Sequence, residues 1–163
     1  MPEPADQTAP AAATTRSILC VDDDANQLLA YEALLSPLSA ELVMSPGPDE
    51  ALQTLATRTF DLVILDVTMP GMSGFDLAVA IRQRFPAMTV APILFVSALD
   101  RRFHVDTAMK AGGDDFLTKP VSGKVLRQHV QRLLSVSGMT DPLERHQAYL
   151  KLKASDPLDD DLQ

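Results

Sequence analysis

Cysteine and long apolar runs are scarce in this 163-residue chain, and each scarcity excludes a class of protein. The single cysteine permits no internal disulfide, which suits a reducing compartment such as the cytoplasm. Cys20 lies within an apolar run and is predicted to be a small core residue. No apolar run approaches the roughly 20 residues of a membrane-spanning helix. The N-terminus also lacks the basic and then apolar pattern of a secretory signal, so we expect a cytoplasmic protein that does not bind a membrane.

Two further shortages concern metals and nucleic acids. His104, His129 and His146 have no metal-type spacing and one cysteine cannot complete a cluster, which argues against zinc. The 14 basic residues are outnumbered by 22 acidic ones, and the net charge of −8 argues against nucleic-acid binding through the whole surface. Hydrophobic residues make up 46% of the chain, which is enough for one domain with a real core and short extensions.

Apolar runs of strand length alternate with helical patterns along most of the chain. Strands buried on both faces read as continuous Val/Ile/Leu runs, and their alternation with helices predicts an α/β fold with a parallel, doubly wound sheet. The expected strands cover residues 18–21, 41–44, 62–65, 92–96 and 115–118, and the expected helices cover residues 28–35, 48–56, 75–85, 103–111 and 122–136.

Three parts of the chain are predicted. Residues 1–15 are rich in Ala, Pro and Thr and form a disordered leader, residues 16–136 form the domain, and residues 137–163 hold a linker, a short helix and an acidic tail. Asp141 and Pro142 are typical of a helix start, with Glu144 completing a capping box. An apolar stripe is predicted on one face of this tail helix, formed by Leu143, Gln147, Leu150 and Ala154.

Charged and polar side chains follow four of the five expected strands. In open α/β sheets ligands bind outside the carboxyl ends of the strands, so these side chains are expected to converge. Three carboxylates in one cleft repel each other, and a divalent cation with a preference for hard oxygen ligands, Mg²⁺, relieves that repulsion. The converging residues are Asp22, Asp23, Asp66, Ser97 and Lys119.

This set of side chains suits phosphoryl transfer. The transferring group carries charge on three equatorial oxygens, which Mg²⁺, Lys119 and Ser97 or a backbone N–H could each hold. Asp66 is then the nucleophile and forms an aspartyl phosphate. The alternative for each residue alone is an ordinary solvated turn or strand end.

Four segments, read in order, resemble the receiver domain of two-component response regulators. They are Ile18-Leu19-Cys20-Val21-Asp22-Asp23-Asp24, residues 61–74 around Asp66, Ile93-Leu94-Phe95-Val96-Ser97-Ala98, and Gly112-Gly113-Asp114-Asp115-Phe116-Leu117-Thr118-Lys119-Pro120. The resemblance covers about residues 16–136. It implies a flavodoxin-like sheet with strand order 2-1-3-4-5.

The resemblance also implies a role for individual residues. Asp66 would accept a phosphoryl group from a phosphohistidine on a sensor histidine kinase or a histidine phosphotransfer protein. Asp23 and Asp66 would bind Mg²⁺ directly, Asp22 largely through water and Thr68 through its backbone carbonyl. Ser97 and Lys119 would contact phosphoryl oxygens, Ser97 and Phe116 would act as the switch pair, and the bond between Lys119 and Pro120 would be cis.

The expected protein is a signalling module that catalyses only its own phosphorylation and a slow dephosphorylation, and is not otherwise an enzyme. Thr68 and Leu99 match positions that tune phosphoryl lifetime in the family, and apolar Leu99 cannot hold a hydrolytic water by hydrogen bonds, so self-hydrolysis is expected to be slow. Because no DNA-binding domain is recognisable after residue 136, output is expected through a protein partner. The tail helix could dock on its own domain, pair two protomers into a homodimer, or recruit a partner.

Three other interpretations stay open. The chain could be a receiver-like scaffold that signals without phosphorylation. It could be an aspartyl-phosphate phosphatase, although Thr68 stands where such enzymes need a second acid. It could also be a fragment of a larger signalling protein, because Thr140-Asp141-Pro142-Leu143 resembles the opening of diguanylate cyclase domains before Glu144 departs from that pattern.

Overall fold

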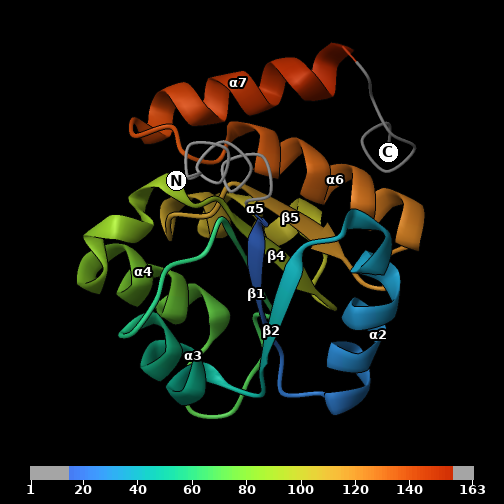
Figure 1. The fold of residues 1–163 in the computed structure, drawn as a ribbon, viewed down its shortest axis with the longest axis vertical. Coiled ribbons are helices and arrows are strands. Elements are labelled where there is room, and N and C mark those ends of the chain that lie inside the picture. Colours follow the sequence, from blue (N-terminus) through green and yellow to red (C-terminus); the bar gives the residue numbers. More distant parts are fainter. Residues whose placement is uncertain (1–14, 156–163) are drawn as a thin grey trace, which may run out of the picture.

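The computed structural model describes residues 15–155, in which strands and helices alternate along the chain (Figure 1). Two short 3₁₀ helices, η1 (Ser36–Leu38) and η2 (Pro86–Val90), join longer elements. Those elements are β1 (Ser17–Val21), α2 (Ala25–Leu35), β2 (Glu41–Ser45), α3 (Pro48–Leu55), β3 (Leu62–Leu65), α4 (Gly74–Arg84), β4 (Ile93–Ser97), α5 (Arg101–Lys110), β5 (Asp115–Thr118), α6 (Gly123–Val136) and α7 (Pro142–Ser155).

The five strands form one parallel sheet in the order β2-β1-β3-β4-β5, which confirms the predicted doubly wound α/β fold and its strand order. The order reverses at β1, so the crevice between β1 and β3 is the switch point at which such sheets bind ligands. The carboxyl ends of β1, β3, β4 and β5 all lie at one edge of the sheet. Side chains that directly follow these strands are therefore brought near one another.

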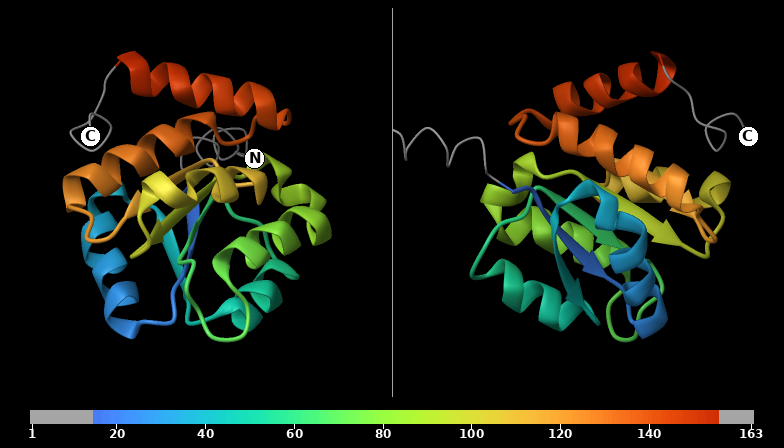
Figure 2. Two further views of the ribbon diagram at one scale, coloured as in Figure 1. Left: turned by 180° about the vertical axis from the view of Figure 1, so that it is seen from behind. Right: turned by 45° about the vertical axis from the view of Figure 1, so that its right-hand side comes forward.

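Helices cover both faces of the sheet, as the two views in Figure 2 show. Alternate residues of each strand point to opposite faces, so β1 sends Leu19 to one core and Ile18 and Cys20 to the other. Helices α3, α4 and α5 contribute to the first core, and α2, α6 and α7 to the second. Cys20 is fully buried on β1, and this burial raises the pKa of its thiol above the ordinary value, as expected of a core cysteine.

Polar caps set where the helices begin. Asp24, Ser73, Asp100 and Ser122 each accept a hydrogen bond from a backbone N–H in the first turn of α2, α4, α5 and α6. Since Asp100 caps α5, that helix starts at Arg101, two residues before the predicted start. At the other end of α5, Gly112 has a φ of 102°, the left-handed conformation typical of a glycine that ends a helix.

Helix α7 packs along α6, and both views place the two side by side (Figures 1 and 2). It begins at Pro142, with the Asp141 carboxylate accepting from the backbone N–H of Leu143. The predicted apolar stripe of α7 is wrong as a packing face, because Leu143 is 64% exposed and Leu150 48%. The buried side chains of α7 are Arg145 and Tyr149. Their carboxylate partners lie 31 and 34 positions earlier in the chain, so a local sequence pattern does not reveal them.

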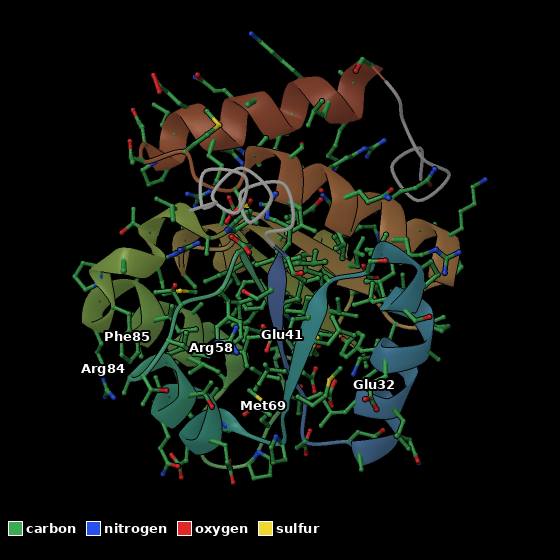
Figure 3. All side chains as sticks on the ribbon, viewed as in Figure 1. Glu32, Glu41, Arg58, Met69, Arg84 and Phe85 are labelled. Atoms are coloured by element: carbon green, nitrogen blue, oxygen red, sulfur yellow. The ribbon has the colours of Figure 1, made fainter. Side chains whose placement is uncertain are left out.

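The exposed face of β2 carries an ion pair of the ordinary surface kind. Arg58 donates two hydrogen bonds to Glu41, at 3.0 and 2.9 Å, and both side chains are labelled in Figure 3. Over residues 15–155 no helix combines the length and the apolarity that crossing a membrane requires. The predicted leader, apart from Thr15, and the predicted acidic tail from residue 156 fall outside the described residues.

Candidate phosphoacceptor site

Asp66 is the first residue after β3 and lies at the carboxyl edge of the sheet. Its backbone N–H still donates to Val21 on β1, at 3.0 Å, so its position is set by the sheet and not by a free loop. The Val67 N–H donates to Oδ1 of Asp66 at 2.8 Å. Gly74, which begins α4, lies so close that a Cβ there would overlap the carbonyl oxygen of Asp66. The backbone around Asp66 is therefore tightly enclosed.

Asp22 and Asp23 follow β1, the neighbour of β3. Asp22 is almost completely buried, whereas Asp23 is exposed. One carboxylate oxygen of each of these two and of Asp66 lie within 4.8 Å of one another. The three acidic residues predicted to converge do so, and we call them the acid cluster.

Lys119 follows β5 and reaches across the sheet edge to the acid cluster. Its Nζ lies 2.9 Å from Oδ2 of Asp22 and 3.8 Å from Oδ1 of Asp66. The peptide bond between Lys119 and Pro120 is cis. The backbone N–H of Lys119 donates to the carbonyl of Ser97 at 2.7 Å, which ties the end of β5 to the end of β4.

Within the part of the chain that the structure describes, the acid cluster brings three carboxylates together with one ammonium group, that of Lys119. Burial is the largest cause that raises the pKa of Asp66, and the charge of Asp22 adds to it, while Lys119 and the Val67 N–H act in the other direction. Negative charge is thus left uncompensated at a partly desolvated position. A set of hard carboxylate oxygens with open coordination positions fits a divalent cation such as Mg²⁺, which keeps several of its waters.

Thr68, Ser97 and Phe116, the other residues predicted to act at this site, differ in their burial and contacts. Thr68 is exposed two residues after Asp66, and its carbonyl as a metal ligand stays a prediction. Ser97 is fully buried at the end of β4, where its hydroxyl accepts from the Leu99 N–H at 3.3 Å. Phe116 is fully buried on β5, stacked against His104 at 6.4 Å and near Phe95 at 6.1 Å between ring centroids. A switch role for Ser97 and Phe116 also stays a prediction.

Sequence reasoning missed a second charged cluster at the opposite end of β5. Asp114 directly precedes this strand and Asp115 begins it, and both are buried. In the sequence these two residues belong to a segment that resembles a family motif, but two adjacent acids at the start of an apolar strand also indicate buried ion pairs. The cations that meet them are Arg82, Arg101, Arg145 and Lys153.

A cavity of about 500 Å³ also lies at this end of the sheet, between Gly112 and the first turn of α7, and not at the acid cluster. The guanidinium groups of Arg82 and Arg145 at its wall are already bonded to Asp114 and to backbone carbonyls. A hydrated cation held by carboxylates does not need a cavity of this size, so the acid cluster remains the candidate site.

Comparison with known proteins agrees with this geometry. The family model of the response regulator receiver domain matches residues 18–131. The match includes β2, β3, β4 and β5, all of β1 except Ser17, and every residue of the acid cluster together with Lys119. The chain belongs to the response regulator receiver domain family.

Individual relatives share that domain. The chain is 32% identical over 150 residues to the sensor protein GacS of Pseudomonas syringae, covering 91% of this chain and 16% of GacS. It is 28% identical to the regulatory protein PhoP of Bacillus subtilis, covering 78% of this chain and 52% of PhoP. The structure resembles the BeF3-activated receiver domain of DrrB, a Thermotoga maritima protein, with a TM-score of 0.66, 27% identity and coverage of 75% of this chain and 99% of that one.

Proposed function

We propose that this chain is a phosphoacceptor receiver in a two-component phosphorelay, phosphorylated on Asp66 with the help of Mg²⁺. The observation that carries the proposal is the acid cluster itself, with three carboxylates within 4.8 Å and Lys119 beside two of them. A phosphohistidine of a sensor histidine kinase or a phosphotransfer protein is the proposed donor. The proposed output is a conformational change that a protein partner recognises, and the proposed location is the cytoplasm.

The proposed reaction is an in-line displacement at phosphorus. A carboxylate oxygen of Asp66 forms the new P–O bond while the P–N bond to the donor imidazole breaks, and the imidazole nitrogen keeps the electron pair. Mg²⁺, when bound, would neutralise charge that builds on the equatorial oxygens. Lys119 would move from its present partners toward one phosphoryl oxygen, and the Ser97 hydroxyl would donate to another.

The carboxylates divide their work according to their present partners. Both oxygens of Asp22 already accept a hydrogen bond, one from the Asp24 N–H at 2.9 Å and one from Lys119 at 2.9 Å. This supports the prediction that Asp22 acts on the metal largely through water. The exposed Asp23 and the Asp66 carboxylate are the proposed direct ligands, with the Thr68 carbonyl completing the set.

Intact-protein mass after incubation with acetyl phosphate tests the proposal. One added phosphoryl group is expected in wild type with Mg²⁺, and none with a chelator or in Asp66→Asn. Asp76→Asn, an exposed acid on α4, is the matched control and should accept the group like wild type. No addition to wild type, together with no binding of beryllofluoride, would reject phosphoacceptor function in favour of a scaffold that signals without phosphorylation.

Leu99 is partly buried against the core beside Ser97, and we propose that it contributes to a slow loss of the phosphoryl group. The apolar side chain offers no hydrogen bond to an attacking water. Leu99→Asn or Leu99→Glu should speed dephosphorylation. Intact-protein mass, recorded over time after the phosphoryl donor is removed, measures the rate. Unchanged rates in both variants would remove Leu99 from the account.

A second context is that of a receiver module inside a larger sensor protein. The match to GacS favours it, because it covers 91% of this chain and only 16% of that sensor protein. The chemistry proposed for Asp66 is the same in either context.

A further inference from the structure

The buried side of helix α7 is a stripe of polar side chains spaced four residues apart. Arg145, Tyr149 and Lys153 fall on one helix face because residues four apart lie one turn above each other. Their side chains are largely removed from water, with Arg145 3% and Lys153 14% exposed and Tyr149 buried. Polar groups buried to this degree need partners.

Each member of the stripe bonds to Asp114 or Asp115. Arg145 Nε lies 2.8 Å from Oδ2 of Asp114, and Lys153 Nζ lies 3.1 Å from Oδ2 of Asp115. The Tyr149 hydroxyl donates to the same Oδ2 of Asp115. Helix α7 is therefore held on the domain through two carboxylates at the start of β5.

Asp115 is also bonded from the opposite side, by Arg101 at the start of α5. The Arg101 guanidinium lies 3.3 Å from Oδ1 of Asp115, and its Nε donates to the carbonyl of Phe116 at 2.9 Å. Two cations from different helices, Arg101 of α5 and Lys153 of α7, thus share one buried carboxylate.

From Arg101 the hydrogen bonds continue to the phosphoacceptor end of the sheet. The Arg101 N–H donates to the Thr118 hydroxyl at 2.8 Å, and that hydroxyl donates to the Leu99 carbonyl at 3.2 Å. The Leu99 N–H in turn donates to the Ser97 hydroxyl at 3.3 Å. A continuous path of contacts joins Ser97 to helix α7 by way of Asp115.

We propose that docking of α7 and loading of Asp66 with a phosphoryl group favour each other, through the competition of Arg101 and Lys153 for Asp115. The inference rests on the proposed function of Asp66. When the Ser97 hydroxyl turns toward a phosphoryl oxygen, the Leu99 N–H loses its acceptor, and the segment that positions Arg101 is loosened. Arg101 then holds Asp115 less firmly.

The sign of the coupling follows from the partners that Asp115 keeps when Arg101 holds it less firmly. A buried carboxylate that loses a cationic partner is destabilised. With α7 docked, Tyr149 and Lys153 still donate to Oδ2, so the loss of Arg101 costs less than it would with α7 detached. By linkage, a phosphoryl group on Asp66 must then tighten the docking of α7 by the same factor.

Titration of the full chain with beryllofluoride and Mg²⁺, followed by ¹⁹F NMR, tests the coupling from the Asp66 side. The variant is Lys153→Met, which keeps the apolar stem and removes the charge, and Lys151→Ala, exposed on the same helix, is the control. Lys153→Met should bind beryllofluoride about five-fold more weakly than wild type, at the low end of measured couplings between sites. Lys151→Ala should match wild type.

Amide hydrogen exchange of α7 tests the coupling from the other side. Saturating wild type with beryllofluoride and Mg²⁺ should slow exchange in α7, and the effect should be absent in Asp66→Asn. Equal affinities of Lys153→Met and Lys151→Ala, or α7 exchange that is unchanged or faster on saturation, would overturn the coupling while leaving phosphorylation of Asp66 intact. If wild type itself neither binds beryllofluoride nor accepts a phosphoryl group, the proposed function fails and the coupling fails with it.

Discussion

The acid cluster and the Asp114–Asp115 cluster lie at opposite ends of the sheet, and each contains buried aspartates, but the surroundings of those aspartates are opposite. Among residues 15–155, one cation contacts the Asp66 side chain, which is 8% exposed, while four contact those of Asp114 and Asp115, which are 4% and 3% exposed. At Asp66, burial and Asp22 raise the pKa. At Asp115, burial works against ionisation, yet Lys153, Tyr149 and His129 outweigh it and hold the pKa below its ordinary value.

The difference separates a binding site from a structural one. Burial of a single side chain does not distinguish them, because the Asp66 side chain is nearly as buried as those of Asp114 and Asp115. The balance of charge does, because a site short of positive charge gains from an added cation, whereas a site already surrounded by guanidinium and ammonium groups does not. Four predictions test this contrast, beginning with the largest effect.

Asp115→Asn should be the most destabilising of these changes. It keeps the shape of the side chain but leaves Lys153 and Arg101 without their shared charge, and breaking a buried ion pair costs about 3–5 kcal/mol. Urea unfolding monitored by circular dichroism measures the loss. A cost below that of an exposed pair would show that the cluster is not structural.

Gly74→Ala should come next and should disturb the opposite end of the sheet. The added Cβ would overlap the Asp66 carbonyl, and because the neighbour is backbone it cannot rotate away. Overpacking of this kind costs about 1–3 kcal/mol, and the shift of Asp66 should also weaken Mg²⁺ binding. Gly138→Ala, at a glycine with open space around it but a φ of 100°, controls for backbone strain alone and should leave Mg²⁺ affinity unchanged.

Asp66→Asn should act in the opposite direction to Asp115→Asn and stabilise the protein when divalent cations are absent. Removing an uncompensated charge near Asp22 should raise the free energy of unfolding at neutral pH by about 0.5–2 kcal/mol, the range common for single stabilising substitutions. Urea unfolding with a chelator present, at several pH values, gives the comparison.

The pH dependence of that gain follows from the raised pKa of Asp66. Between the ordinary carboxyl pKa and the raised pKa of folded Asp66, the folded state binds more protons than the unfolded state. Wild type is therefore destabilised by the Asp66 charge as the pH rises through the raised pKa. The gain of Asp66→Asn should therefore vanish below the ordinary carboxyl pKa. The contribution of Asp115 behaves oppositely and is lost only as the pH falls through its lowered pKa. Equal stability of Asp66→Asn and wild type at every pH would contradict this account of the acid cluster.

Arg58→Ala should have the smallest effect and serves as the reference for exposed charge. Its two hydrogen bonds to Glu41 have good geometry, but exposed ion pairs contribute about 0–1 kcal/mol. The same urea experiment should place it well below Asp115→Asn. A comparable loss in both variants would mean that burial does not set the value of an ion pair in this protein.

Much of the fold could be predicted because its signals are local. The strands at Leu62–Leu65 and Asp115–Thr118 have the predicted bounds. Each is a short run with residues that favour strands, and a charged residue follows directly after it. The acid cluster was predictable for a related reason, because parallel strands bring residues that follow them to one edge.

The packing face of α7 was not predictable in this way. Apolar periodicity selected Leu143 and Leu150, yet they face solvent. The buried face is formed by Arg145 and Tyr149. Their burial is stabilised by carboxylates that lie 31 and 34 positions earlier in the chain. Polar residues pack inward only where such partners exist, and a local pattern carries no record of them.

The thiol of Cys20 reports on opening of the sheet. It is the chain's only thiol, it lies on the inner strand β1 two residues before Asp22, and it is fully buried with a raised pKa. A thiol reagent can modify it only after the sheet opens around β1, because the reactive form is an exposed thiolate. The rate of labelling in native buffer therefore reports how often the strand opens that directly precedes two of the three residues of the acid cluster, and no cysteine has to be introduced.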